Sequence, residues 1–240
     1  MTPRVSLAAL RSLLIGVAVL GAGVPKAAEK FAIPAQPPPA ALAADKGRFR
    51  ILVGGQQVGK EDFEIVQSGA NWVARGTSEL KGTDGLTQVT GTLELHADGT
   101  PAHYDWSTQG AKKASASIGF NGPTATINLV VEGAKPFTQQ FTFNGPLIAV
   151  LDNNLYHQYA VLARLYDWNK KGAQTFSVLV PQSMTPGSVT VETLGPQNAE
   201  GKRLDELRVK TEDIELDLYL EHQRLIRIIA PDANAEIVRE

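Results

Sequence analysis

A histidine and an aspartate two residues apart form the first pattern in this chain that could carry chemistry. His103 and Asp105 have the spacing that places both side chains on the same side of a strand. Such a pair can orient an imidazole for base catalysis or supply two metal ligands, with His96 as the nearest third ligand. A polar sheet face beside the Asp98-Gly99 turn explains the same residues, and we favour it. We therefore predict neither a metal site nor a cofactor.

A second pattern is a row of acidic residues near the C-terminus: Asp213, Glu215, Asp217 and Glu221. Alternate positions on a strand would bring Glu215 and Asp217 to roughly 7 Å from each other. Carboxylates at such a distance can hydrolyse glycosides or hold calcium. Basic residues on neighbouring strands offer cross-strand partners instead: Arg208, Lys210, Arg224 and Arg227. We expect a solvated, charge-paired outer face, and a hydrolase that uses these carboxylates or His103 and Asp105 stays open as a less favoured alternative.

The segment Gly54–Lys60 satisfies the pattern G-x-x-x-x-G-K of a phosphate-binding loop. That loop needs a helix N-terminus after it and a Ser or Thr that binds magnesium. The magnesium position here is Glu61, whose carboxylate would repel phosphates, and the residues that follow alternate like a strand. The segment therefore predicts a hairpin turn and no nucleotide site.

Aromatic side chains and one histidine supply the candidates for a ligand cavity. Tyr156, His157 and Tyr159 lie in a predicted helix, Trp168 ends the same segment, and Trp106 belongs to a predicted strand. If the helix lines a cavity, His157 with Tyr156 or Tyr159 is its main polar feature. Aromatic residues more often fill a core. We expect His157 at the border between helix and sheet, with its tip in solvent.

The first 43 residues have the pattern of a signal peptide followed by a Pro-rich leader. Arg4 and Arg11 precede the apolar run Ser12–Val24, and small residues and prolines follow in Ala35–Ala44. The run is shorter than the about 20 apolar residues that a membrane-spanning helix needs. We predict a periplasmic or secreted bacterial protein with no transmembrane span in the mature chain. An uncleaved amphipathic N-terminus on a cytoplasmic protein is the alternative.

The composition narrows the classes of fold and partner. The chain has no cysteine, which excludes disulfides and thiolate metal sites. Its net charge is −2, and loss of the basic leader would make the remainder more acidic. An acidic domain has no electrostatic basis for binding nucleic acid. Residues 46–240 are long enough for one β-rich domain with a sizeable core.

Most of the chain from Arg48 onward alternates between apolar and polar residues with the period of a strand. Runs such as Arg48–Val53 and Ile214–Glu221 are separated by turns rich in Gly, Asn and Asp. About a dozen such runs predict a mainly β (α+β) fold. We expect a strongly curved antiparallel sheet, or open half-barrel, with one amphipathic helix on its concave side. A two-sheet sandwich is the alternative.

The strand pattern breaks at Pro146. Between Leu147 and Trp168, apolar residues recur at a spacing of three and four, which predicts one amphipathic helix that stops before Gly172. Three polar residues offer N-caps for it: Asp152, Asn153 and Asn154.

This order of segments resembles that of periplasmic half-barrel proteins, including the lipoprotein-carrier superfamily. Three stretches also resemble a loosely defined group of uncharacterised exported bacterial proteins: FRILVGGQQVGKEDFEI, LDNNLYHQYAVLARLYDWNKKGAQTFSVLVPQ and LDLYLEHQRLIRIIAPDANAEIVR. The likeness covers nearly all of residues 48–240. The carrier resemblance implies a curved sheet closed by helices around acyl chains, although the carriers usually have more than one helix. It implies no catalytic residue.

The function that we expect first is a non-catalytic periplasmic or envelope domain, with a binding or accessory role. Its concave face would hold an apolar or amphipathic ligand, so that its partner is a hydrophobic small molecule or an envelope protein. A structural or protein-interaction module of the cell envelope is the second possibility. The hydrolase is the third.

Overall fold

The computed structural model describes residues 42–240 apart from 84, 112, 146, 171, 200, 212 and 213. The predicted leader, residues 1–43, lies almost wholly outside the described residues, as does Asp213 of the acidic row. The strands of the described residues belong to one 15-stranded sheet. The prediction of a curved, mainly antiparallel sheet with one helix is confirmed, and the two-sheet sandwich is not observed among the described residues.

The first eight strands form a meander in which each strand pairs with the next. They are β1 (Asp45–Val53), β2 (Gln56–Ser68), β3 (Asn71–Gly82), β4 (Gly85–Leu95), β5 (Pro101–Gln109), β6 (Ala114–Asn121), β7 (Thr124–Val131) and β8 (Phe137–Thr142).

The second half of the chain starts with the short strand β9 (Ile148–Val150), which is followed by the helix α2 (His157–Leu165). The remaining strands are β10 (Gln174–Val180), β11 (Thr185–Ala199), β12 (Lys202–Lys210), β13 (Glu215–Glu221), β14 (Arg224–Ala230) and β15 (Ala235–Arg239). Two short 3₁₀ turns, Pro181–Ser183 and Pro231–Ala233, follow β10 and β14.

The first and last strands of the chain are neighbours in the middle of the sheet. The strand order is β8-β7-β6-β5-β4-β3-β2-β1-β15-β14-β13-β12-β11-β10-β9. All neighbours are antiparallel except β9 and β10, which are parallel. Because β1 pairs with β15, the two halves of the chain form one continuous surface.

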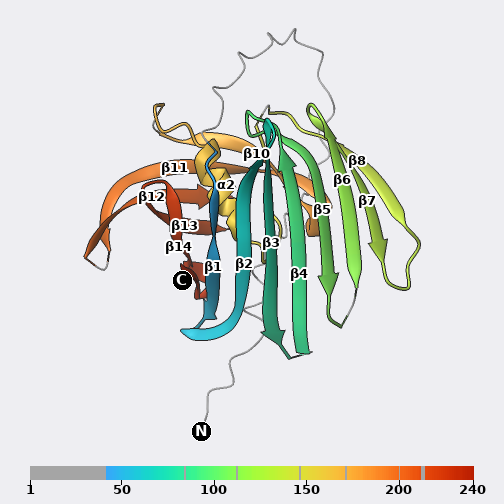
Figure 1. The fold of residues 1–240 in the computed structure, drawn as a ribbon, viewed down its shortest axis with the longest axis horizontal. Coiled ribbons are helices and arrows are strands. Elements are labelled where there is room, and N and C mark those ends of the chain that lie inside the picture. The colour runs from blue at the N-terminus through green and yellow to red at the C-terminus, as the bar shows by residue number, and fades with distance from the viewer. Residues whose placement is uncertain are drawn as a thin grey trace.

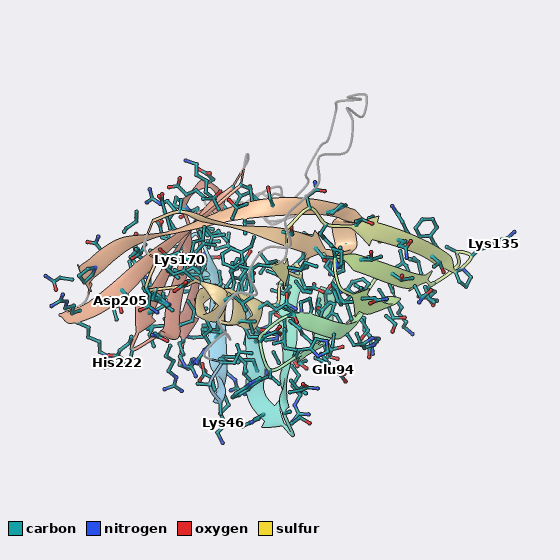
Figure 2. The ribbon with its side chains drawn as sticks, turned by 90° about the horizontal axis from the view of Figure 1, so that it is seen from above. Lys46, Glu94, Lys135, Lys170, Asp205 and His222 are labelled. Atoms are coloured by element: carbon teal, nitrogen blue, oxygen red, sulfur yellow. The ribbon has the colours of Figure 1, made fainter. Side chains whose placement is uncertain are left out.

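The sheet curls around α2. Figure 1 shows the helix between the strands of the N-terminal half, in blue and green, and those of the C-terminal half, in orange and red. Seen from above, the two halves form walls on opposite sides of the helix (Figure 2). Alternate residues of each strand face inward, so that Phe49, Phe63 and Ile65 are buried, as the alternation predicts.

The segment that resembles a phosphate-binding loop is a hairpin turn, as predicted. Gly54 and Gly55 both have positive φ, at 58° and 76°, and Val53 pairs with Gln56 across the turn. Positive φ at two successive turn residues is the geometry of the tight hairpins that glycine favours.

The helix is much shorter than its pattern predicted. It covers His157–Leu165 instead of most of Leu147–Trp168, and Ile148–Val150 is strand β9. A short apolar run suits either a strand or a buried helix. In this protein the run forms a strand because β9 pairs with β10.

The predicted N-caps of the helix are also wrong. Tyr156 occupies the N-cap position and makes no side-chain cap hydrogen bond. The polar residues proposed for this role, Asp152, Asn153 and Asn154, all lie in the loop before the helix, where Asn154 adopts a positive φ of 68°.

Candidate functional site

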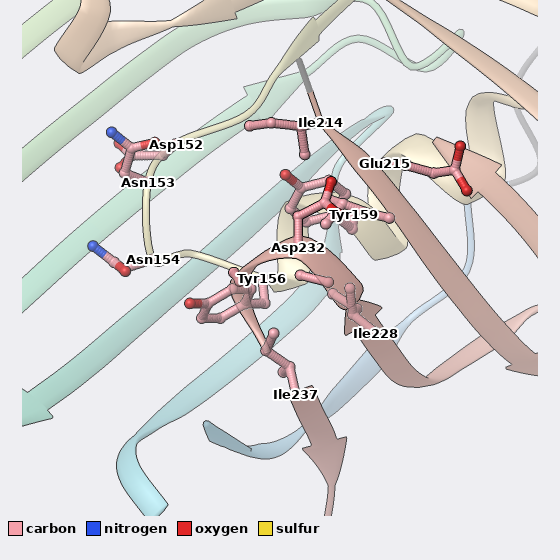
Figure 3. A pocket seen from close by; sticks show the side chains of 13 residues that line it. Asp152, Asn153, Asn154, Tyr156, Tyr159, Ile214, Glu215, Ile228, Asp232 and Ile237 are labelled. Carbon is pink, nitrogen blue, oxygen red and sulfur yellow. The ribbon is translucent and has the colours of Figure 1, made fainter. Parts of the chain in front are cut away.

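A cavity of 170 Å³ lies between the start of α2 and the C-terminal strands. Figure 3 shows Tyr156 and Tyr159 at the helix, facing Ile228 and Ile237 on the red strands. The lining also includes the loop before the helix and the 3₁₀ turn after β14. The complete lining is Asp152, Asn153, Asn154, Tyr156, Tyr159, Ile214, Glu215, Leu216, Ile228, Ala230, Asp232, Ala233 and Ile237.

Two of the five residues predicted to line a cavity do so. Tyr156 and Tyr159 are 4% and 8% exposed, and burial raises the pKa of both phenols well above its usual value. Both hydroxyls therefore stay protonated at any ordinary pH and act as neutral hydrogen-bonding groups in the wall of the cavity.

His157 lies behind this wall and not in it. The expectation of a half-exposed border residue is wrong, because His157 is 0% exposed. Its Nδ1 lies 2.5 Å from Oε1 of Glu61, which is also completely buried. The Phe63 ring stacks on the imidazole at 6.0 Å between centroids. The Nε2 atom of His157 is buried and has no partner among the described residues.

Glu61 caps the helix from a different part of the chain. Its carboxylate accepts hydrogen bonds from the backbone N–H of Tyr156 at 2.8 Å and from that of His157 at 3.4 Å. The first N–H groups of a helix have no partners within the helix, and the helix dipole favours an anion there. A carboxylate on β2 thus fixes the start of α2, which is the end of the helix that borders the cavity.

Glycines on β3 and β4 leave room for this helix end. A Cβ at Gly76 would lie 2.5 Å from Nδ1 of His157 and 2.7 Å from Oε1 of Glu61. A Cβ at Gly91 would lie 2.6 Å from Cδ1 of Leu155, just before the helix, and 2.5 Å from the Tyr104 hydroxyl. All these distances are shorter than real Cβ contacts, so the helix entry sits this close to the sheet only because these positions lack side chains.

Asp152 anchors the loop that enters the helix. Its carboxyl accepts a hydrogen bond from the Tyr104 hydroxyl at 2.5 Å and a second one from the amide of Gln182. The side-chain oxygen of Gln158 accepts a hydrogen bond from the backbone N–H of Asp152. Burial raises the pKa of Asp152 to about 8, against the smaller lowering effect of its two hydrogen bonds. The same burial, together with Asp152, raises the pKa of Tyr104.

The two tryptophans proposed for a cavity lie away from it. Trp106 is 8% exposed and belongs to the core on β5, where it borders a separate hollow over β4–β7. Trp168 donates its indole N–H to the carbonyl oxygen of Ala163 at 3.2 Å. It satisfies a carbonyl of the last turn of α2, and its ring packs edge-on against Tyr166.

The histidine–aspartate pair is a surface feature, as we favoured. His103 Nε2 lies 3.1 Å from Asp105 Oδ1, with side-chain exposures of 36% and 62%, and 3.2 Å from the Ser117 hydroxyl. His96 lies in the turn after β4, where its backbone N–H donates to the carbonyl oxygen of Thr100. In the part of the chain that the structure describes, no group of three His, Asp or Glu side chains could hold a metal ion.

The acidic row is paired with basic residues, as predicted for Arg208 and Lys210. Arg224 and Arg227 pair with Asp45 and Glu236, and Asp217 is buried, so the expectation of a fully solvated face is wrong. Arg208 Nε lies 2.9 Å from Asp217 and 3.1 Å from Glu215, and Lys210 also pairs with Glu215 at 3.2 Å. Glu221 pairs with Lys202 at 3.2 Å. This row lies on β13 and the His103–Asp105 pair on β5, and neither belongs to one group of three or more acidic or histidine side chains that could hold a metal ion among the described residues.

None of the described helices is long and apolar enough to span a membrane. No family model matches this chain, and no curated protein matches it.

Two solved structures are similar in fold. A β-barrel-like protein of the domain of unknown function DUF1849 from Brucella abortus has a TM-score of 0.55 and 9% sequence identity, over 82% of this chain and 94% of that chain. A protein of the DUF1089 family from Pseudomonas aeruginosa has a TM-score of 0.46 and 9% identity, over 71% of this chain and 89% of that chain. The first likeness supports the architecture of a curled β-sheet, and neither carries a function or a site residue to this chain.

Proposed function

We propose that this chain is a non-catalytic binding domain of the bacterial cell envelope that holds the apolar part of a small ligand between α2 and the strands β13–β15. The observation that carries the proposal is the cavity of 170 Å³, in which aliphatic and tyrosine side chains form an apolar part beside five acidic or amide residues. An aliphatic cavity of about 150 Å³ in another protein holds a benzene molecule, so a cavity of this size takes a ring or a short chain.

The position of the cavity supports a binding role. Small-molecule sites are concave and mostly apolar, with a few polar groups that fix the orientation of the ligand. The wall formed by Tyr156 and Tyr159 is held by the Glu61 cap on one side and by the Asp152 network on the other. A preformed wall costs little conformational entropy when a ligand binds.

The export pattern of residues 1–43 and the order of the segments support an envelope location. The lipoprotein carriers, which this order resembles, hold acyl chains under a curved sheet. Here α2 and its buried polar partners fill the centre of the concave side, so the proposed ligand is much smaller than an acyl lipid.

Native mass spectrometry of the protein purified from envelope fractions tests this proposal. We expect a co-purifying mass of small-molecule size that organic extraction removes. The variant Ala233→Leu, which places three more carbon atoms in the cavity lining, should lose that mass while it keeps its thermal unfolding temperature. A bare polypeptide from several gentle preparations, together with no binding of small apolar probes, would contradict the proposal.

A structural or protein-interaction module is the second candidate. Large hydrophobic side chains are exposed near the β8 edge of the sheet, where Val130 and Phe137 are each 49% exposed. Crosslinking in intact cells separates the two functions. A reproducible protein adduct that Phe137→Ser abolishes would favour the interaction module.

A further inference from the structure

The cavity between α2 and β13–β15 has an acidic lining. Three of its residues carry carboxyl groups, Asp152, Glu215 and Asp232, and two carry amides, Asn153 and Asn154. None of the residues that line it is a lysine, arginine or histidine. A ligand that enters this cavity therefore meets hydrogen-bond acceptors and negative charge, and no positive charge.

The three carboxyl groups differ in how far their charge is already neutralised. Glu215 pairs with Arg208 and Lys210, and Figure 3 shows its carboxylate turned away from the tyrosines. Asp152 is buried and accepts hydrogen bonds from Tyr104 and Gln182.

Asp232 is different, because it is exposed and has no cationic partner among the described residues. It lies in the 3₁₀ turn Pro231–Ala233, and its neighbour Ala233 packs against the core. Figure 3 shows it over the cavity, opposite the loop that carries Asn153 and Asn154. The unneutralised charge of the site is therefore at its rim, while the floor is formed by Ile228, Ala230 and Ile237.

We propose that the ligand is a small organic cation, in which a protonated amine at the rim is joined to an apolar body of about six to eight carbon atoms in the cavity. The amine would interact with Asp232 and donate hydrogen bonds to the acceptors beside it. A fatty acid of the same length would place its carboxylate against this negative rim. The assignment rests on the proposed binding function of the same cavity.

Three ligands of equal length test the inference: hexylamine, hexan-1-ol and hexanoate, each titrated at pH 7 and followed by backbone amide chemical shifts. We expect the strongest shifts at Ala230, Ala233 and Ile237. We expect hexylamine to bind about two- to fivefold more tightly than hexanol, since one exposed charge pair contributes up to about 1 kcal/mol. Hexanoate should bind most weakly.

The outcomes separate this inference from the proposed function. If hexanol binds as tightly as hexylamine, or hexanoate binds best, the cation assignment is wrong and the binding function stands. If none of the three compounds shifts the signals of the cavity, both are wrong.

Variants then locate the charge that selects the amine. Asp232→Asn removes the charge from the rim and should reduce the preference for hexylamine over hexanol to less than about twofold. Hexanol binding should be unchanged. The matched control is Glu94→Gln on β4, an exposed acidic residue outside the cavity, which should preserve the preference. A preference that survives Asp232→Asn intact would overturn the role of this carboxylate.

Discussion

The carboxyl group of Asp152 should make the protein less stable as the pH rises towards 8. This group is buried beside the helix entry, and its pKa is raised from the ordinary 3.8 to about 8 because burial disfavours its charged form. In the unfolded chain the same group returns to its ordinary pKa. Between about pH 4 and pH 8 the folded state therefore binds a proton that the unfolded state releases.

The sign and size of the effect follow from proton linkage. The free energy of unfolding decreases with rising pH wherever the folded state binds more protons. One proton corresponds to about 1.4 kcal/mol per pH unit, so this group alone removes about 2–3 kcal/mol between pH 6 and pH 8. The contribution is complete below pH 4 and is lost as the pH rises through about 8.

Urea unfolding of the wild type and of Asp152→Asn, at steps between pH 5 and pH 9, isolates this group. An asparagine is neutral at every pH, and because Tyr104 and Gln182 donate to different oxygens of Asp152, its NH2 group would face one of these two donors. We therefore expect the wild type to be more stable than the variant at pH 5 and to lose this advantage by pH 8. Asp105→Asn, at an exposed carboxylate, serves as the control and should follow the wild-type curve. If the difference between wild type and Asp152→Asn is the same at pH 5 and pH 8, the reasoning is refuted.

Three further predictions concern the contacts that hold the helix and the sheet. Glu61→Ala should lower the free energy of unfolding by about 3–5 kcal/mol, because the helix amides and a buried imidazole lose their acceptor. Glu61→Gln should cost less. If urea unfolding shows equal losses for the two variants, Glu61 does not act as the helix cap. Gly76→Ala should cost about 1–3 kcal/mol through overlap with the helix end, whereas Gly119→Ala, which meets open space, should not destabilise the protein in the same titration. Arg239→Met should lower the Tm, because it removes a cation at 2.7 Å from the buried carboxylate of Asp45. It should cost less than the about 3–5 kcal/mol of an unpaired buried charge, since Arg224 still pairs with Asp45 at 3.1 Å, and an unchanged Tm would show that the Arg239 pair is dispensable.

The strands were predictable because their signal is local. Alternation along β1 and β2 and the turn at Gly54-Gly55 need only neighbouring residues, and the structure has both as expected. The extent of the helix was not predictable in this way. Ile148–Val150 is strand only because it lies beside β10, which follows some 25 residues later in the chain and is reached through the helix itself.

The residues of the candidate site could be predicted from the sequence only in part. Glu61 stands two residues before Phe63, so the alternation already placed a carboxylate on the core side of β2. Nothing local indicated that its partner is His157, which is 96 residues away. The cavity likewise depends on how α2 sits against β13–β15, and residues such as Asp232 and Ile237 become part of a site only through that packing.

The pairing of β1 with β15 determines the order in which the strands of the sheet can assemble during folding. Asp45 and Arg239, joined across this seam, are 194 residues apart in the chain. During synthesis the hairpins β1–β8 can pair as each one emerges, because their contacts are local. One edge of β1 stays open until β15 is made, and an open strand edge invites pairing with other chains.

A chain interrupted before β15 would therefore expose the edges of β1 and β14 together. The strand β15 joins the two halves of the sheet. Nascent chains should depend on chaperones until that strand arrives, and products that lack it should aggregate or be degraded instead of persisting as half-folded molecules.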